Sequence, residues 1–160
     1  AASVENRMWA LRAELQSFGE AEELHSRNSR MFWREIRDVR PFVGQEKVPN
    51  VWRLSVPPSA GSKTAFAILE ECRGEVFYDW GGGLIWLALA PLTDAGAATV
   101  RKFVGVAGGH ATLVRAGRDV RARVAVFQPL EGATATVVKG IKDGFDPNGV
   151  LNPGRMYEGI

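Results

Sequence analysis

The chain has 160 residues, 46% of them hydrophobic and 24% charged, which is ordinary for a soluble globular protein with a buried core. Its 20 basic residues nearly balance 18 acidic ones, and a net charge of +2 is too small to indicate nucleic-acid or membrane binding by itself. The single cysteine, Cys72, excludes an internal disulfide framework and favours a reducing compartment. The longest apolar run, residues 84–91, is about half of what a membrane span needs. The N-terminus also lacks the pattern of a signal peptide.

The first quarter of the chain is predicted to be helical. Apolar residues at helical spacing predict an amphipathic helix over residues 5–18 that ends near Gly19. A second helix is predicted over about 28–40, followed by a loop over 41–49. The apolar face of this second helix carries Phe32, Ile36 and Val39. The chain begins without methionine and enters a helical pattern at once, which indicates either a piece of a longer protein or a processed terminus.

The pattern changes at Asn50, where apolar and polar residues begin to alternate. Strands are predicted over 50–56, 75–79, 84–90 and 110–116. Helices are predicted over 62–73 and between Thr93-Asp94 and Gly108-Gly109. The order βαββαβ is that of a ferredoxin-like fold, an antiparallel sheet with two helices on one face, so we expect an α+β protein. An extended segment, 120–127, and a last helix over about 131–144 complete the prediction.

Several small residues are assigned to element boundaries. Ser62 is expected to cap the helix over 62–73, and Gly74 to end it. Residues 81–83, all glycine, lack the spacing of a phosphate-binding loop and join two strands. They favour a hairpin turn with positive φ, although a triple glycine would also let a ligand approach the backbone.

Metal and nucleophile chemistry have little support in the sequence. The two histidines, His25 and His110, and the single cysteine lack metal-ligand spacing, so no metal site is predicted. Cys72 falls on the inner side of its helix, which favours a core residue over a nucleophile. His110 begins a strand and is either a structural residue or an acid, base or hydrogen-bond donor.

Two arginines are candidates for binding an anion. Arg53 lies between Trp52 and Leu54, which are expected to face inward, so its side chain is predicted on the opposite face of the sheet. Arg115 on the last strand is a candidate of the same kind. Each is either a solvent-exposed arginine or, where another domain covers that face, a clamp whose planar guanidinium binds both oxygens of a carboxylate.

The strands are rich in aromatic residues, and core packing explains most of them. An RNA-binding module of this topology would carry a basic-glycine-aromatic signature on its third strand. Residues 84–90 are instead apolar on both faces, which is typical of a strand covered on both sides. No nucleic-acid partner is therefore expected.

The tail, residues 145–157, contains two turns in series. Residues 146–149, Asp-Pro-Asn-Gly, place proline second and glycine last, and residues 152–154, Asn-Pro-Gly, form another turn. Between them lies the apolar pair Val150-Leu151. The tail is either a terminus packed through Leu151 or a device that holds Asn152 where backbone and side chain meet a ligand.

This tail resembles the C-terminal motif of FAD-linked oxidases with a vanillyl-alcohol-oxidase type fold. In that motif a helix ends in Asp-Pro, then Gly, then Leu-Asn-Pro-Gly-Lys/Arg. Four further segments resemble the FAD-binding E subunits of bacterial glycolate oxidases, so that the resemblance covers about residues 30–157. They are Phe-Trp-Arg-Glu-Ile-Arg at 32–37, Leu-Ser-Val-Pro-Pro at 54–58, Asp-Trp-Gly-Gly at 79–82 and Gly-Gly-His at 108–110.

The resemblance implies a cap domain over residues 50–160, with residues 1–49 as a helical segment before it. In that family a separate N-terminal domain binds the adenine and pyrophosphate of FAD, and the sheet of the cap covers the isoalloxazine. The substrate is a small 2-hydroxy acid that gives a hydride to the flavin. The implied substrate-binding residues are Arg53, Trp80, His110 and Arg115. The implied FAD-binding residues are Gly82, Asn152, Pro153 and Arg155.

Two features depart from the family. The chain contains nothing like the glycine-rich flavin-binding half, so we expect this chain alone to hold no FAD and to be inactive. Ile85 also stands where the family commonly has a basic residue before the tryptophan. The implied partners are the FAD domain, a paralogous flavin subunit and an iron–sulfur subunit. The protein would be cytoplasmic, or peripheral at the inner membrane through that complex.

A different class of function remains open. A stand-alone ferredoxin-like module could bind a small ligand or a partner protein without redox chemistry. Such a module has no need of two rigid turns after its last helix, so the tail favours the oxidase. In the oxidase interpretation, the sheet face left uncovered in this chain predicts self-association.

Overall fold

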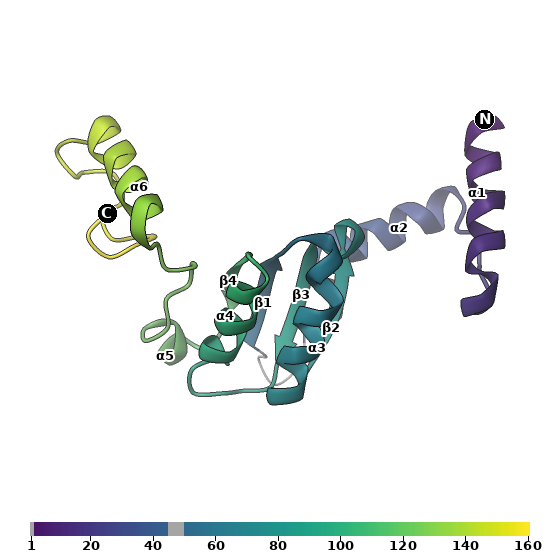
Figure 1. Cartoon of the computed structure of the whole chain (residues 1–160), viewed down its shortest axis with the longest axis horizontal. Coiled ribbons are helices and arrows are strands. Elements are labelled where there is room, and N and C mark those ends of the chain that lie inside the picture. The colour runs from purple at the N-terminus through teal and green to yellow at the C-terminus, as the bar shows by residue number, and fades with distance from the viewer. Residues whose placement is uncertain (1, 45–49) are drawn as a thin grey trace. The chain divides into compact units, whose positions relative to one another are not determined.

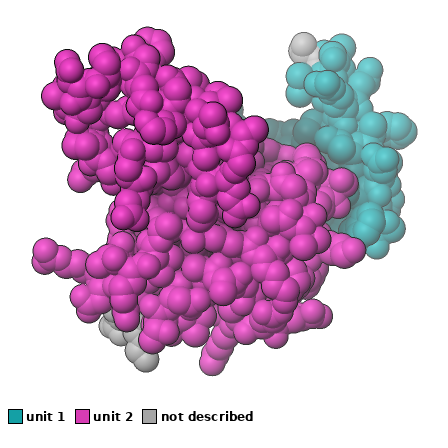
Figure 2. Space-filling view, turned by 60° about the vertical axis from the view of Figure 1, so that its left-hand side comes forward, with its two compact units in different colours: residues 1–41 teal, residues 42–160 magenta. Residues whose placement is uncertain are grey.

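The computed structural model describes residues 2–44 and 50–160, and Figure 2 colours its two compact units, residues 1–41 and 42–160. The end of the predicted 41–49 loop, with Pro49, lies outside the described residues. None of the helices in the described part of the chain combines the length and the apolar character that crossing a membrane requires.

The first unit contains the two predicted helices. Helix α1 (Ala2–Leu15) continues as a 3-10 turn to Phe18, and α2 spans Ser26–Arg37. Neither helix contains a buried residue. The prediction that α2 reaches residue 40 is wrong, because Val39 has a φ of 52° and therefore leaves the right-handed helical conformation.

The second unit contains a four-stranded antiparallel sheet with the order β2-β3-β1-β4. The strands are β1 (Asn50–Ser55), β2 (Gly74–Asp79), β3 (Leu84–Leu89) and β4 (His110–Arg115). Helices α3 (Gly61–Glu71) and α4 (Ala97–Val106) lie on the same face of the sheet (Figure 1). The predicted ferredoxin-like α+β fold is confirmed.

The core lies between the sheet and these two helices. Alternate strand residues point toward the helices, as the two-residue period of a strand requires. Trp52 is fully buried, and its indole N–H donates to the Ala95 carbonyl at 2.8 Å. Cys72 is a buried core residue, as predicted. The other fully buried large residues are Leu54, Ile68, Ile85, Leu87, Leu89, Val100, Val104 and Leu113.

Two predicted helix boundaries are wrong. Helix α3 begins at Gly61 with Ala60 in the N-cap position, so Ser62 does not cap it. Gly74 opens β2 instead of ending α3. Glycine is required there by close packing, because a Cβ atom at this position would lie 2.4 Å from the Ala88 carbonyl oxygen. The start of α4 differs less, since Asp94 accepts the Gly96 N–H at 2.9 Å and Gly96 is the N-cap.

The segment after the sheet also differs from its prediction. The expected extended run over 120–127 begins instead inside a short helix, α5 (Arg118–Arg121). Its later part runs beside the edge strand β4, where Leu113 N–H donates to the Val126 carbonyl at 2.8 Å. Because this bond covers part of a free sheet edge, the segment protects β4 from pairing with other chains. Helix α6 (Gly132–Phe145) follows and contains no buried residue.

Candidate functional site

The face of the sheet opposite α3 and α4, called the outer face here, carries three rows of side chains that cross all four strands. The pairing register determines each row, in the order β2, β3, β1 and β4. The first row is Asp79, Leu84, Ser55 and His110. The second is Phe77, Trp86, Arg53 and Thr112. The third is Glu75, Ala88, Val51 and Arg115, where Arg115 is paired with Val51 through a shift of register between Val51 and Trp52. The predicted position of Arg53, opposite Trp52 and Leu54, is therefore correct.

Part of the outer face is covered from within the second unit. The Phe42 side chain is buried, and its ring centre lies 5.3 Å from that of Phe77. Phe77 in turn stacks on Trp86 with a centroid distance of 6.4 Å. Arg115 donates to the Phe42 carbonyl at 2.8 Å. This bond gives Arg115 a packing role at the end of the face that Phe42 covers, in addition to any role in binding.

Arg53 lies in the middle row, and its guanidinium reaches toward the turn between β2 and β3. Its Cζ atom is 5.5 Å from the centre of the Trp80 ring, a cation–π contact. Arg53 is half-buried, and among the described residues no carboxylate pairs with it. Such an arginine, held against an indole and without an anionic partner, can bind a carboxylate through two parallel N–H groups.

The turn between β2 and β3 places Trp80 over Arg53. Asp79 accepts the Trp80 N–H at 2.7 Å, and Trp80, Gly81 and Gly82 all have positive φ, from 53° to 95°. The predicted positive-φ hairpin is thus present at Gly81 and Gly82. A tryptophan in this region is strained, and strained backbone of this kind is concentrated at binding sites. The indole is 62% exposed, so it does not occupy this position to fill the core.

His110 begins β4 and lies on the outer face, where it is directly paired with Ser55 of β1. Its exposed side chain also lines a cavity of about 760 Å³, together with Thr112, Phe127, Gln128 and Tyr157. Arg101 of α4 fixes one wall of this cavity by donating to the Phe127 carbonyl at 3.1 Å. Burial lowers the pKa of Arg101 from its usual value, and its Nε atom is buried without a hydrogen-bond partner among the described residues.

The tail forms both predicted turns. Gly149 N–H donates to the Asp146 carbonyl at 3.0 Å, and Arg155 N–H donates to the Asn152 carbonyl at 3.1 Å. Asn152 has a φ of 46°. Leu151 is 59% exposed, so the interpretation of the tail as a terminus packed through Leu151 is wrong.

A single buried carboxylate organises the first of these turns. Asp146 accepts the N–H groups of Val150 and Leu151 at 3.0 and 2.8 Å and the Lys142 ammonium at 2.6 Å. Lys142 also donates to the Leu151 carbonyl at 2.6 Å. The Lys142 hydrogen bond, followed by that from Leu151, lowers the pKa of Asp146 to about 2.

The structure therefore brings together only part of the predicted site. Arg53 and Trp80 are in contact, and Gly82 belongs to the same turn as Trp80. His110 and Arg115 lie on the same face, one row to either side of Arg53. The remaining predicted residues, Asn152, Pro153 and Arg155, are exposed in the tail. Ser55 and Thr112 also lie beside these residues on the outer face. The sequence prediction did not include them, although each lies two residues from a predicted site residue in the same strand.

The chain is similar to a glycolate oxidase subunit. It is 33% identical over 127 residues to glycolate oxidase subunit GlcE of Escherichia coli (strain K12). The match covers 79% of this chain and 31% of that protein, so the chain spans about a third of the relative's length. No protein-family model matches the chain, and no solved structure matches it.

Proposed function

We propose that this chain is the cap part of an FAD-linked oxidoreductase of the glycolate oxidase type, and that it binds a small 2-hydroxy acid beside the flavin. The similarity to GlcE over 79% of the chain is the observation that carries this proposal. The vanillyl-alcohol-oxidase type of fold for the complete protein is part of the proposal. So are a paralogous flavin subunit and an iron–sulfur subunit as partners.

The uncovered end of the outer face fits a planar aromatic ligand. Trp86 is half-buried and Trp80 is 62% exposed, so both present ring surface on which a planar ligand can stack. Gly82 lies in the same turn as Trp80, and a Cβ atom there would lie 3.0 Å from the Pro58 carbonyl oxygen. When bound, the flavin accepts a hydride from the α-carbon of the acid. In the proposal a separate FAD domain holds the adenine and pyrophosphate, and Asn152, Pro153 and Arg155 contact that domain or its FAD.

The residues of this chain bind and orient the acid. Arg53 binds its carboxylate through two N–H groups, and Trp80 holds the guanidinium in place from one side. His110, on the neighbouring strand, lies where it can hydrogen-bond the acid or take the proton of its hydroxyl group. Arg115 adds positive charge at the end of the face that Phe42 covers. Orientation of the α-carbon toward the acceptor is the main contribution of such a cap.

The test uses the complete protein that contains this chain. We expect it to purify with bound FAD and to lose visible flavin absorbance when glycolate is added without an electron acceptor. The 160-residue chain alone should purify colourless and leave an added dye acceptor unreduced by glycolate. Absence of FAD from the complete protein, or flavin absorbance unchanged by glycolate and other 2-hydroxy acids, would contradict the proposal.

A further inference from the structure

Four polar side chains form a compact block on the outer face, called the polar quartet here. Arg53 pairs directly with Thr112 across β1 and β4, and Ser55 pairs directly with His110. Directly paired residues on one face lie about 5 Å apart and diagonal neighbours such as Ser55 and Thr112 about 7–8 Å, so a ligand that lies between the two pairs can contact all four. The neighbours of the quartet on β3 are Leu84 and Trp86, so the polar block has an apolar border on that side.

The fold does not use the two hydroxyl groups of the quartet. Within residues 2–44 and 50–160, neither the Ser55 nor the Thr112 hydroxyl is hydrogen-bonded to another residue. Both side chains are half-buried. The other side chains of their two rows are the apolar Leu84, Phe77 and Trp86 and the polar Asp79, Arg53 and His110. Other hydroxyls of the chain do have internal partners, as Thr99 has in Glu71 at 3.1 Å. Both hydroxyl groups are therefore available to a ligand that accepts or donates hydrogen bonds.

The chemistry of the quartet matches that of a 2-hydroxy acid. The guanidinium fork of Arg53 suits the carboxylate, and a hydroxyl on the adjacent carbon then lies within a few ångströms, over Thr112 and Ser55. Thr112 and His110 also line the cavity of about 760 Å³, which leaves room beyond the hydroxyl-bearing carbon. An acid without the hydroxyl group, such as acetate, would bind Arg53 through its carboxylate but would leave the hydroxyl groups of Thr112 and Ser55 without a partner.

We propose that Thr112 and Ser55 are the specificity-determining residues of this site and bind the 2-hydroxyl group of the acid. The inference rests on the proposed function, because it takes the carboxylate of the ligand to lie on Arg53. The site distinguishes 2-hydroxy acids from simple carboxylic acids, since a polar group built to bind a hydroxyl is left unpaired when the hydroxyl is missing.

The experiment compares glycolate with acetate, which differ only by the hydroxyl group. Binding to the complete protein is measured by titration calorimetry after reduction with dithionite, so that glycolate binds without being oxidised. Thr112→Val keeps the shape of the side chain and should weaken glycolate binding about 3- to 10-fold, the value of one hydrogen bond, while acetate binding stays unchanged. Ser55→Ala should act in the same direction, and Thr112→Ser should restore glycolate binding.

Matched controls lie on the helices of the opposite face. Thr99→Val on α4 and Ser62→Ala on α3 should change the affinity for neither acid. Arg53→Ala should weaken glycolate and acetate binding by the same factor. If Arg53→Ala changes the affinity for neither acid, Arg53 does not bind the carboxylate and the proposed function is contradicted. If Arg53→Ala acts as expected but both hydroxyl variants bind glycolate like the unmodified protein, or lose acetate equally, the specificity proposal alone is overturned.

Discussion

The sheet and the C-terminal tail reach their shapes by different means. The sheet is held by apolar burial, with Leu54 and Leu87 fully removed from solvent. The tail has no comparable apolar core, and one carboxylate, Asp146, organises its first turn through three hydrogen-bond donors. The sheet should therefore lose stability when side-chain volume is removed, and the tail when charge is removed. The variants below test this difference, from the largest expected loss of stability to the smallest.

Truncating a core leucine should have the largest effect. Leu54→Ala leaves a cavity between the sheet and its helices, so the free energy of unfolding should fall by about 2–5 kcal/mol. The matched change in the tail, Leu151→Ala at a side chain 59% exposed, should cost less than about 0.5 kcal/mol. Urea unfolding followed by circular dichroism measures both. Equal losses would show that the tail has a core of its own.

Adding one carbon where α3 meets the β2–β3 turn should also be costly. A Cβ atom at Gly61 would lie 2.0 Å from the Gly82 carbonyl oxygen, so Gly61→Ala must displace the turn and should cost about 1–3 kcal/mol. Gly140 in α6 has open space at the same position, and Gly140→Ala should be neutral or stabilising. Thermal unfolding of the two variants gives the comparison, and a neutral Gly61→Ala would refute the close packing.

The stability of the first turn of the tail should instead depend on pH. Because the pKa of Asp146 is about 2 in the folded chain, against an ordinary value of 3.8, its contribution is complete above about pH 4. The contribution is lost as the pH falls through about 2. The protection factors of the Val150 and Leu151 amides, taken against the intrinsic exchange rate at each pH, should therefore fall between these values, and in Asp146→Asn they should be low already at neutral pH. Protection that persists at pH 2 would mean that the turns stand without the carboxylate.

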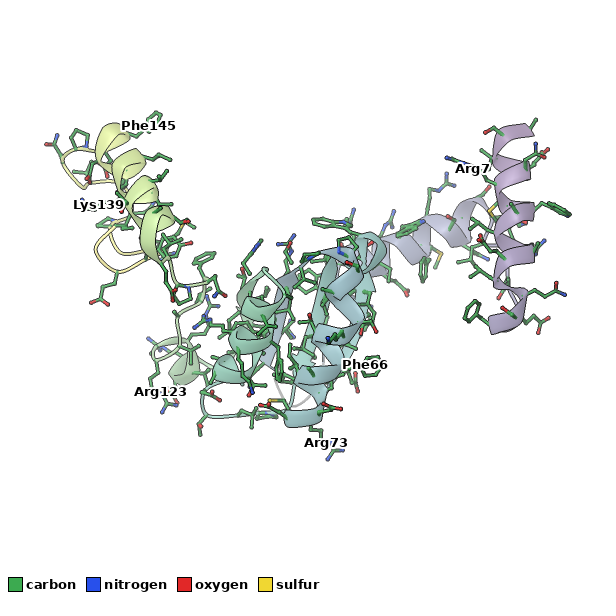
Figure 3. All side chains as sticks on the ribbon, viewed as in Figure 1. Arg7, Phe66, Arg73, Arg123, Lys139 and Phe145 are labelled. Atoms are coloured by element: carbon green, nitrogen blue, oxygen red, sulfur yellow. The ribbon has the colours of Figure 1, made fainter. Side chains whose placement is uncertain are left out.

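Polar substitution on α6 should have the smallest effect on the chain itself. Ile141 and Phe145 are 55% and 86% exposed, and Figure 3 shows the Phe145 ring projecting away from the helix. Ile141→Ser and Phe145→Ser should change the unfolding free energy of this chain by less than about 0.5 kcal/mol. If α6 packs on an FAD domain, the same changes should lower the melting temperature of the complete protein. A large loss in the isolated chain would reveal an internal contact of α6.

The sequence predicts the order of the elements because hydrophobic period is a local property. Alternation in residues 50–56 and helical spacing in residues 62–73 are visible without knowledge of the partners. Boundaries such as Gly74 could not be predicted, since its glycine is required by the Ala88 carbonyl on another strand. Helix α5 was missed because its four residues are too few to show a period.

The same limit applies to the candidate site. Alternation alone places Arg53 on the outer face, opposite Trp52 and Leu54. It does not reveal that Thr112 is its direct neighbour, because Arg53 and Thr112 are far apart in the sequence and only the folded sheet defines the register that pairs them. The contact of Trp80 with Arg53 depends likewise on three successive positive φ angles in the turn.

Glycolate kinetics of Arg53→Ala in the complete protein test whether Arg53 holds the carboxylate of a 2-hydroxy acid. We expect a KM for glycolate at least about tenfold higher, the value of a charge-assisted hydrogen bond, with an unchanged melting temperature. Arg73→Ala, at an exposed arginine just before β2, should leave both quantities unchanged. An unaltered KM with a lowered melting temperature would contradict the account and make Arg53 a structural residue.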